Sequence, residues 1–541
     1  MAAKFCDMED IRDLVGQRFV VDFPGTEITP GLRRLIRKGR VGGVILFSGN
    51  IASVAQVQAL TRDLQALASE AGLPSLWISV DQEGGIVNRF GRDFPVFPSA
   101  MAIGAEGDEE AASIAGSVTG RALRALGINV NHAPVLDVNV NPDNPIVGIR
   151  AFGDDPEVVG RLGSAYVRAL QAWGVLCTVK HFPGHGDVAV DSHLELPVVD
   201  KPLEVLEREE LAPFRAAFTA GARGLMAAHV LYPALDAGLP ATLSARVLTG
   251  LLRGRMGFDG RPRQAGPDRP RHTGLLRGRM GFDGVVFTDA MGMKAVADRW
   301  TRGEAAVAAL RAGADVVMAC GTEAEQWASI RSALSAAAAG VLDAGQIAAS
   351  TRRILRAKEA CAGPPGRWDI RAEDFAAAQS VADRAVTLLR DRVGRVPLRP
   401  GRTAVMHLGG ELWDRSPTAL GHELLQVRPN VEVVTDPHHL ASDVWTNVVV
   451  ASLSWRSVSN AEVVRDLWAR VGERLVVVGV GNPYELAGFP EVGTYLATYG
   501  PDAPSLRAAA RVLTGELLPR GRLPVAIPGL YPRGHRGATD P

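Results

Sequence analysis

Cysteine is scarce in this chain of 541 residues, and long apolar runs are lacking. The cysteines lie far apart, which argues against a zinc knuckle, a redox pair and a disulfide framework and favours a reducing compartment. No run of about 18 apolar residues lacks a charge, and the first residues, MAAKFCDMEDIRDL, contain acids where a secretory signal needs an apolar run. We therefore expect a cytoplasmic protein without a membrane span. The four cysteines are Cys6, Cys177, Cys320 and Cys361.

An excess of charge of either sign is also lacking, because 59 Lys and Arg balance 59 Asp and Glu, giving a formal net charge of +0. This balance gives no reason to expect a nucleic acid or an acidic membrane as a partner. Hydrophobic residues make up 47% of the chain, which is typical of globular proteins with buried cores. The length favours two domains rather than one.

Short apolar, β-branched runs alternate with Ala-rich helical patterns through the first two thirds of the chain, which predicts parallel strands joined by helices. There are eight such runs, the number that closes a TIM-type (β/α)8 barrel, although the periodicity is also compatible with a doubly wound open sheet. The runs are residues 14–23, 41–48, 76–82, 128–138, 176–182, 224–232, 284–291 and 314–320.

Polar residues at the ends of these runs favour the barrel over the open sheet. Asp81, His181, His229 and Asp289 each lie at or just past the C-terminal end of an expected strand. Barrels build their active sites at that face. The alternative for any single one of them is a turn residue or the N-cap of the following helix.

A Pro/Gly-rich stretch, CAGPPGRWD, starts at residue 361 and predicts a linker. We expect a barrel domain at residues 1–362 and a smaller α/β sandwich at residues 363–541, because TAVMHLG, NVVVASLS and RLVVVGVG have the composition of buried parallel strands. GVGNPY lacks the spacing of a nucleotide-binding glycine loop, so no nucleotide cofactor is expected.

The segment TGLLRGRMGFDG occurs twice, at residues 249–260 and 273–284. Two copies do not make a repeat architecture, which needs three or more stacked units. We interpret residues 249–284 as a 24-residue tandem duplication that lengthens the connection into the seventh strand, on the face of the barrel away from the chemistry.

Residues 180–193, KHFPGHGDVAVDSH, contain one Lys, three His and two Asp, which raises the alternatives of a metal site and of proton transfer. His181, His185 and His193 could supply metal ligands, but a Pro-Gly turn separates the first two, and Lys180 would repel a dication. Asp191 stands two residues before His193, where its carboxylate can hold one ring nitrogen and leave the other for a substrate. Proton transfer is the favoured interpretation.

The FTDAMGM run adds a carboxylate, Asp289, at the end of a strand of small and apolar residues. A carboxylate that faces an acid/base group is the arrangement of retaining glycoside hydrolysis. That scheme normally uses two carboxylates, so a histidine in the acid role would be a departure from it.

These motifs together resemble glycoside hydrolase family 3, and more narrowly its β-N-acetylhexosaminidase branch in a two-domain form. The second domain is similar too, in AVTLLRD, GNPYELAGFP and TYGPDAPSLRAAARVLTGE. Ala290 departs from the second acid that many single-domain relatives carry after the nucleophile. The barrel motifs that carry the resemblance are DQEGGIVNRF, NHAPVLDVNVNP, NPIVGIRAFG, KHFPGHGDVAVDSH, MAAHVLYPALD and GFDGVVFTDAMGM.

The resemblance implies a role for individual residues. Asp289 corresponds to the nucleophile that forms a glycosyl-enzyme, and His193 to the acid/base that Asp191 assists. No metal or other cofactor is implied, and the second domain is expected to support the barrel rather than supply a catalytic group. The sugar-binding positions of the family fall on Asp81, Arg89, Arg150, Lys180 and His181.

The expected activity is therefore retaining, exo-acting hydrolysis of terminal β-linked N-acetylglucosamine from muropeptides or chitooligosaccharides in peptidoglycan turnover. The expected partner is a small carbohydrate, and the expected state is a monomer or a homodimer. A phosphorylase stays open, because a histidine repels an incoming phosphate less than a glutamate would, and so does a β-glucosidase. The rivals from other classes are a catalytically silent sugar-binding protein and a metal hydrolase.

Overall fold

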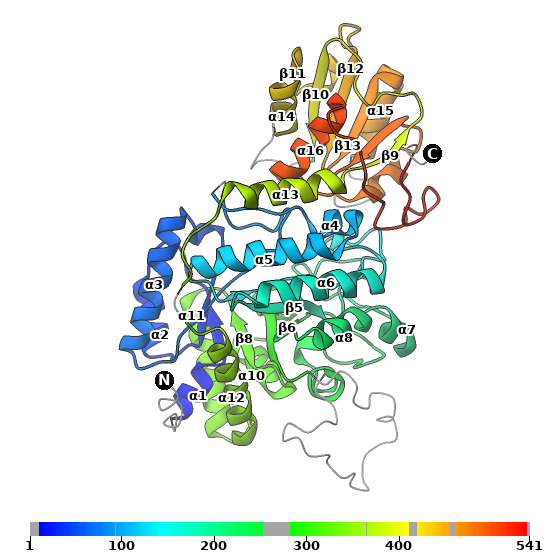
Figure 1. The fold of residues 1–541 in the computed structure, drawn as a ribbon. Helices are drawn as coiled ribbons and strands as arrows, with labels where there is room; N and C mark the ends of the chain where they lie inside the picture. The colour runs from blue at the N-terminus through cyan, green and yellow to red at the C-terminus, as the bar shows by residue number, and fades with distance from the viewer. Residues whose placement is uncertain are drawn as a thin grey trace.

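The structure, a computed structural model, describes residues 10–91, 93–252, 282–363, 365–409, 419–454 and 460–537. Eight parallel strands close into a barrel in sequence order, and β8 pairs back with β1 (Figure 1). The predicted TIM-type barrel is confirmed, and the open-sheet alternative is wrong. The strands are β1 Phe19–Val21, β2 Gly43–Leu46, β3 Trp77–Val80, β4 Val130–Asn131, β5 Leu176–Phe182, β6 Gly224–Ala227, β7 Val285–Ala290 and β8 Val316–Ala319.

The first expected strand, residues 14–23, is shorter in the structure than the apolar run suggests. Its first residues belong to helix α1, Ile11–Gly16, and only Phe19–Val21 form β1. The side chain of Asp10 caps α1 by accepting a hydrogen bond from the backbone N–H of Arg12. An N-cap acid in front of the apolar run was the sequence signal for this helix.

Helices surround the barrel, and several begin at a capping side chain that satisfies their free backbone N–H groups. Thr301 and Glu304 form a capping box at the start of α10, and Thr322 and Glu325 form another at α11. The helices of this domain after α1 are α2 Pro30–Arg37, α3 Val54–Glu70, α4 Ala100–Glu106, α5 Glu109–Ala125, α6 Pro156–Gln171, α7 Leu203–Arg208, α8 Leu211–Thr219, α9 Lys294–Ala297, α10 Arg302–Ala312, α11 Glu323–Ala338 and α12 Ala344–Ala360.

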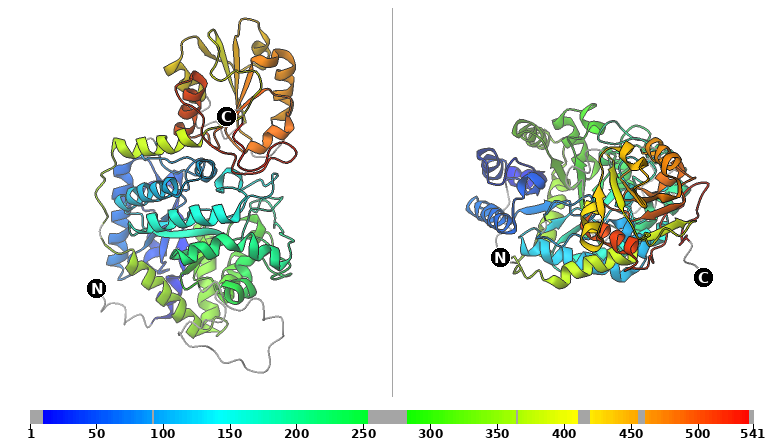
Figure 2. Two further views of the ribbon diagram at one scale, coloured as in Figure 1. Left: turned by 45° about the vertical axis from the view of Figure 1, so that its right-hand side comes forward. Right: turned by 90° about the horizontal axis from the view of Figure 1, so that it is seen from above.

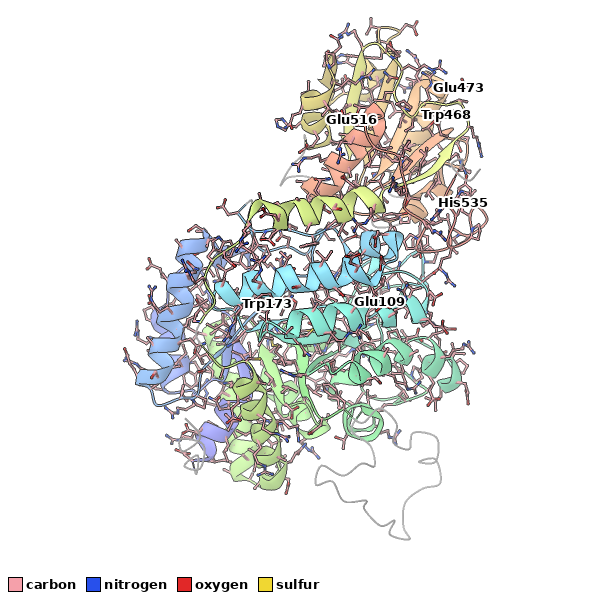
Figure 3. All side chains as sticks on the ribbon, in the orientation of Figure 1. Glu109, Trp173, Trp468, Glu473, Glu516 and His535 are labelled. Atoms are coloured by element: carbon pink, nitrogen blue, oxygen red, sulfur yellow. The ribbon has the colours of Figure 1, made fainter. Side chains whose placement is uncertain are left out.

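Helices α5 and α6 pack closely because glycine stands where they meet. A Cβ on Gly116 would lie 2.6 Å from the carbonyl oxygen of Tyr166, so a larger residue would push the helices apart. Glu109 and Trp173 lie toward opposite ends of this pair (Figure 3). The indole Nε1 of Trp173 donates to Ser117 Oγ at 2.9 Å, which ties the end of α6 to α5.

The second domain is a six-stranded sheet in the order β11-β10-β12-β13-β14-β9, in which β9 alone pairs antiparallel. Alternate residues of its strands point to opposite faces: Val448 and Val450 pack with α15, whereas Val449 packs with α14 and α16. The predicted smaller α/β sandwich is confirmed. Its elements are β9 Thr387–Asp391, β10 Thr403–Leu408, β11 Val431–Val433, β12 Asn447–Ser452, β13 Leu475–Gly479, β14 Thr494–Ala497, α13 Ala372–Ala385, α14 Ala419–Val427, α15 Ala461–Val471 and α16 Ala503–Thr514.

The second domain packs against segments of the barrel that follow β3 and β4, and α13 lies along the junction (Figures 1 and 2). Tyr484, which follows β13, donates its hydroxyl to the carbonyl of Asn139 at 3.0 Å. Ser99 Oγ donates to the carbonyl of Tyr499, which follows β14, at 2.6 Å. Segments that follow the carboxyl ends of strands in both domains therefore meet at the junction.

Most of the duplicated segment, residues 253–281, lies outside the described residues, so its expected position is not addressed. The described part of the chain contains no helix with the length and apolar character needed to cross a membrane.

Candidate active site

A cavity of about 300 Å³ opens at the carboxyl ends of the barrel strands. Asp81 follows β3 directly, Lys180 and His181 lie near the end of β5, and Asp289 is the penultimate residue of β7. Every lining residue in the described part of the chain comes from the barrel domain. Seven of the eight predicted site residues line this cavity: Asp81, Arg89, Arg150, Lys180, His181, His193 and Asp289.

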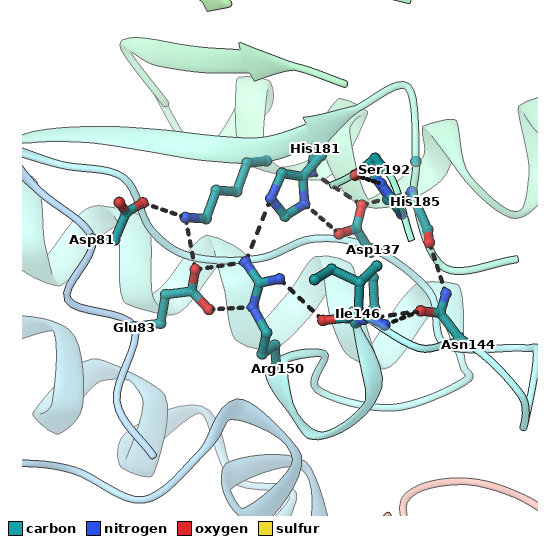
Figure 4. A network of polar contacts seen from close by, with 12 residues as sticks. Asp81, Glu83, Asp137, Asn144, Ile146, Arg150, His181, His185 and Ser192 are labelled. Carbon is teal, nitrogen blue, oxygen red and sulfur yellow. Dashed lines mark hydrogen bonds and ion pairs between the residues drawn. The ribbon is translucent and has the colours of Figure 1, made fainter. Parts of the chain in front are cut away.

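A buried ion-pair network forms one wall of the cavity (Figure 4). Lys180 Nζ lies 2.7 Å from Asp81 Oδ1 and 2.7 Å from Glu83 Oε1. Arg150 binds the same Glu83 in a bidentate manner, with Nε to Oε2 at 2.9 Å and Nη2 to Oε1 at 2.8 Å. Arg89 approaches the other side of Asp81 at 3.7 Å and lies over the ring of Phe47. Glu83 thus orients two of the predicted sugar-binding cations.

The network also sets the charge of its members. Burial would raise the pKa of Asp81, but Lys180, His132 and Arg89 outweigh it and hold this pKa well below its usual value. Burial likewise opposes ionisation of Glu83, yet Arg150 and Lys180 lower its pKa to about 2. Asp81, Glu83, Lys180 and Arg150 are therefore ionised at neutral pH.

His181 is fixed by a buried carboxylate. Its Nδ1 lies 2.7 Å from Asp137 Oδ2, and Asp137 Oδ1 accepts the backbone N–H groups of His181 and His185 at 3.0 and 2.8 Å. Because Asp137 accepts at Nδ1, the Nε2 of His181 faces the cavity side, 3.5 Å from Arg150 Nη2. The family resemblance implied a sugar-binding role for His181, and its contact with Asp137 accounts for the orientation of the ring.

The Asp191–His193 pair forms as its spacing predicts. Asp191 Oδ1 lies 2.8 Å from the ring Nδ1 of His193 and accepts its backbone N–H at 2.8 Å. The side chain of His193 is 56% exposed, so it stands at the mouth of the cavity with Nε2 available. Asp191 does not line the cavity itself and contacts His193 only at Nδ1 and the backbone N–H.

The chain that carries this pair is anchored at its base. Ser192 Oγ lies 3.1 Å from His185 Nε2, and the carbonyl of Ser192 accepts from Ala295 N–H at 3.2 Å. A Cβ on Gly186 would lie 1.7 Å from the carbonyl oxygen of Val138, so only glycine allows this approach. The packing of this loop therefore requires the last glycine of the PGHG sequence, Gly186.

Asp289 also borders the cavity, as a partly buried carboxylate whose Oδ1 accepts the N–H of Ala290 at 2.7 Å. Burial would raise its pKa, but the imidazoles of His229 and His181 and the Ala290 N–H together lower it below the usual value. An ionised, partly desolvated carboxylate at the floor of a cavity is suited to nucleophilic attack.

Comparisons with known proteins identify the family of the chain. Residues 10–261 and 265–357 match the model of the glycosyl hydrolase family 3 N-terminal domain. The chain belongs to glycosyl hydrolase family 3. The resemblance predicted from the motifs, and with it the expected class of enzyme, a glycoside hydrolase, is confirmed.

Relatives within family 3 include β-hexosaminidase A of Pseudoalteromonas piscicida, 38% identical over 54% of this chain, and β-hexosaminidase of Nitrosospira multiformis, 35% identical over 56%. The matched region spans 48% of the first relative and 79% of the second. A family 3 β-N-acetylglucosaminidase from Paenibacillus sp. str. FPU-7 shares the structure with a TM-score of 0.86 at 35% identity, covering 96% of this chain and 99% of that one.

Two carboxylates that organise the family 3 site, Glu83 and Asp137, were missed by sequence reasoning. Glu83 stands two residues after Asp81, inside the DQEGG motif, and Asp137 interrupts the apolar run PVLDV. A charged residue in an apolar run needs a buried partner, and that was the available signal for Asp137. For Glu83 no such signal existed, because its partners come from distant segments.

The metal alternative gains no support from the histidines. His181 contacts Asp137, His185 contacts Ser192 and His193 contacts Asp191. Within the described ranges, no three His, Cys, Asp or Glu side chains are grouped in a way that could hold a metal ion.

Proposed function

We propose that the protein is a retaining exo-β-N-acetylhexosaminidase that releases terminal N-acetylglucosamine. The main support is that Asp289 and His193, which Asp191 holds, border one cavity at the carboxyl face of the barrel. A cavity of about 300 Å³ has room for about one sugar ring, which favours exo action. Relatives that bear β-hexosaminidase names support the acetamido sugar.

The reaction proceeds in two steps. A carboxylate oxygen of Asp289 bonds to the anomeric carbon while the glycosidic C–O bond breaks, and protonated His193 gives its Nε2 proton to the departing oxygen. The now neutral His193 takes a proton from water, whose oxygen bonds to the anomeric carbon as the bond to Asp289 breaks. Asp191 stabilises the imidazolium before the first step and after the second.

The charges of the cavity favour a neutral substrate. Lys180 and Arg150 each already contact carboxylates, so their remaining donors suit sugar hydroxyls rather than an additional anion. Because these cations already have carboxylate partners, water is favoured over phosphate as the acceptor. The phosphorylase and the β-glucosidase stay as alternatives within the same site.

Muropeptides or chitooligosaccharides in peptidoglycan turnover are the proposed substrates, and the cytoplasm is the proposed compartment. The support for the compartment is that Cys177, Cys320 and Cys361 are free thiols, which suits a reducing environment. The proposed partner is the carbohydrate alone, with the protein as a monomer or a homodimer.

Release of p-nitrophenol from the β-N-acetylglucosaminide and the β-glucoside, with and without phosphate or chelator, tests the proposal. We expect turnover of the acetamido sugar that a chelator does not affect, with the β-anomer of the sugar as the first product in NMR spectra. Asp289→Asn and His193→Ala should abolish or strongly reduce it. Asp283→Asn and His439→Ala are matched controls, because both side chains are exposed.

Faster turnover with phosphate would favour the phosphorylase, and faster turnover of the glucoside would favour the β-glucosidase. Unchanged activity in Asp289→Asn would contradict the assignment of the nucleophile. Activity that a chelator removes would favour the metal hydrolase.

A further inference from the structure

His229 is a fully buried imidazole beside the cavity to which the proposed mechanism gives no role. It follows β6 and points across to the end of β7, where its Nε2 lies 3.1 Å from the carbonyl oxygen of Ala290. Its Nδ1 lies 2.9 Å from Thr242 Oγ1. Both ring nitrogens are therefore engaged, one of them next to the nucleophile.

The partners of His229 determine where its hydrogen lies. A carbonyl oxygen only accepts, so Nε2 must donate to Ala290. Burial outweighs the charge of Asp289 and lowers the pKa of His229, which favours the neutral ring near pH 7. The hydroxyl of Thr242 lies 3.1 and 2.6 Å from the carbonyl oxygens of Ala227 and Ala228 and also contacts Nδ1, so it ties the ring to the end of β6. Thr242 thereby holds the ring in the orientation that points Nε2 at Ala290.

Ala290 is the link between this imidazole and the nucleophile. Its carbonyl accepts from His229 Nε2 and from the N–H of Met293 at 3.0 Å. Its own N–H donates to Asp289 Oδ1 at 2.7 Å. Fixing Ala290 from the carbonyl side therefore fixes the N–H that holds Oδ1, and the second carboxylate oxygen keeps a constant direction toward the cavity.

We propose that His229, held in orientation by Thr242, is a positioning residue that aims the carboxylate of Asp289 at the anomeric carbon. The proposal rests on the proposed function, because it assumes that Asp289 is the nucleophile. His229 acts through Ala290 and does not touch the substrate.

Four variants separate a hydrogen-bonding role from mere packing. His229→Phe fills the ring volume but removes the donor, whereas His229→Gln keeps an N–H donor near the position of Nε2. Thr242→Val removes the hydroxyl at nearly constant volume, and Thr242→Ser retains it. If only packing matters, the two variants at each position should show the same rate of covalent labelling.

The assay measures the first chemical step by itself. A 5-fluoro glycosyl fluoride of N-acetylglucosamine carries a leaving group that needs little acid assistance, and its ring fluorine slows hydrolysis of the glycosyl-enzyme. The saturating rate of covalent labelling, followed by mass spectrometry of the intact chain, reports attack by Asp289. His193→Ala serves as the control and should label at nearly the wild-type rate.

We expect His229→Phe to label about 10- to 100-fold more slowly, because a small displacement of a reacting group costs on that order, with the concentration for half-saturation nearly unchanged. His229→Gln should recover most of the rate. Thr242→Val should label about 3- to 10-fold more slowly, and Thr242→Ser should match the wild type.

Equal labelling rates in the wild type, His229→Phe and Thr242→Val would overturn the proposal. So would equal losses within each pair, which would mean that packing rather than the donated hydrogen bond matters. If the wild type is not labelled and hydrolyses no hexosaminide, the proposed function itself fails, and that result is distinguishable because it does not depend on the variants.

Discussion

Replacement of Glu83 by Gln tests the buried ion-pair network most directly. The variant keeps the shape of the side chain but removes the charge that Arg150 and Lys180 share. The three side chains are 6%, 13% and 3% exposed, so the two cations would lose a counter-ion that water cannot replace well. Breaking a buried pair in this way costs roughly 3–5 kcal/mol.

The pKa of Glu83 gives a second estimate of the same cost. Its shift from 4.5 to about 2 corresponds to about 3 kcal/mol, at roughly 1.4 kcal/mol per pH unit. The folded-state pKa lies below the unfolded value, so this contribution is fully present above about pH 4.5 and is lost as the pH falls toward 2. The stability difference between wild type and variant should shrink over that window.

Thermal unfolding at pH 7, pH 4 and pH 2.5 measures this difference. We expect Glu83→Gln to lower the melting temperature at pH 7 by roughly 5 °C and to reduce kcat/KM on the hexosaminide about 10- to 100-fold. Glu323→Gln is the control, because its pair with Arg34 is exposed and should contribute little to stability. Equal effects of the two substitutions, or a loss that does not change with pH, would refute the reasoning.

Three further predictions concern other groups. Asp191→Asn should reduce kcat on the order of 100-fold or more in steady-state assays, because the imidazolium of His193 loses its counter-ion. Ser192→Ala, which removes the contact with His185, should lower kcat/KM about 3- to 10-fold while the melting temperature stays within about 2 °C. Burial raises the pKa of Glu485 to about 8, so the native state is destabilised as pH rises from about 4.5 to 8. Glu485→Gln should therefore melt higher than wild type at pH 8 and show little gain at pH 4.5 in the same unfolding assay.

The barrel strands could be predicted because each is a short, β-branched run that must be buried on both faces. The face that carries the site followed from polar residues at the ends of those runs, since the topology places all such ends together. Periodicity did not distinguish the closed barrel from an open sheet, because closure depends on the pairing of β8 with β1, residues almost three hundred positions apart. The start of the first strand was wrong because apolar residues of α1 continue its pattern.

The predicted site residues come together in the structure, but their assigned roles remain predictions. Local spacing was sufficient for Asp191 and His193, which interact within one turn of chain. It was insufficient for Glu83, which contacts Arg150 and Lys180, or for Asp137, because those pairs form only when separate strand ends meet. A residue expected to act on the substrate is easier to identify from the sequence than the second residue that holds the first one in position.

His193 and Asp289, the two reacting groups of the proposed mechanism, differ in solvent exposure, and the proposed chemistry requires this difference. His193 is 56% exposed at the mouth, where a leaving group departs and the attacking water arrives. Asp289 is only partly exposed at the floor, where a carboxylate is less solvated and therefore a stronger nucleophile. If both were exposed, water would weaken the attack, and if both were buried, the acid/base group could not reach the water of the second step. The direction of the cavity thus supports the proposed nucleophile on β7 and the proposed proton transfer by the loop after β5.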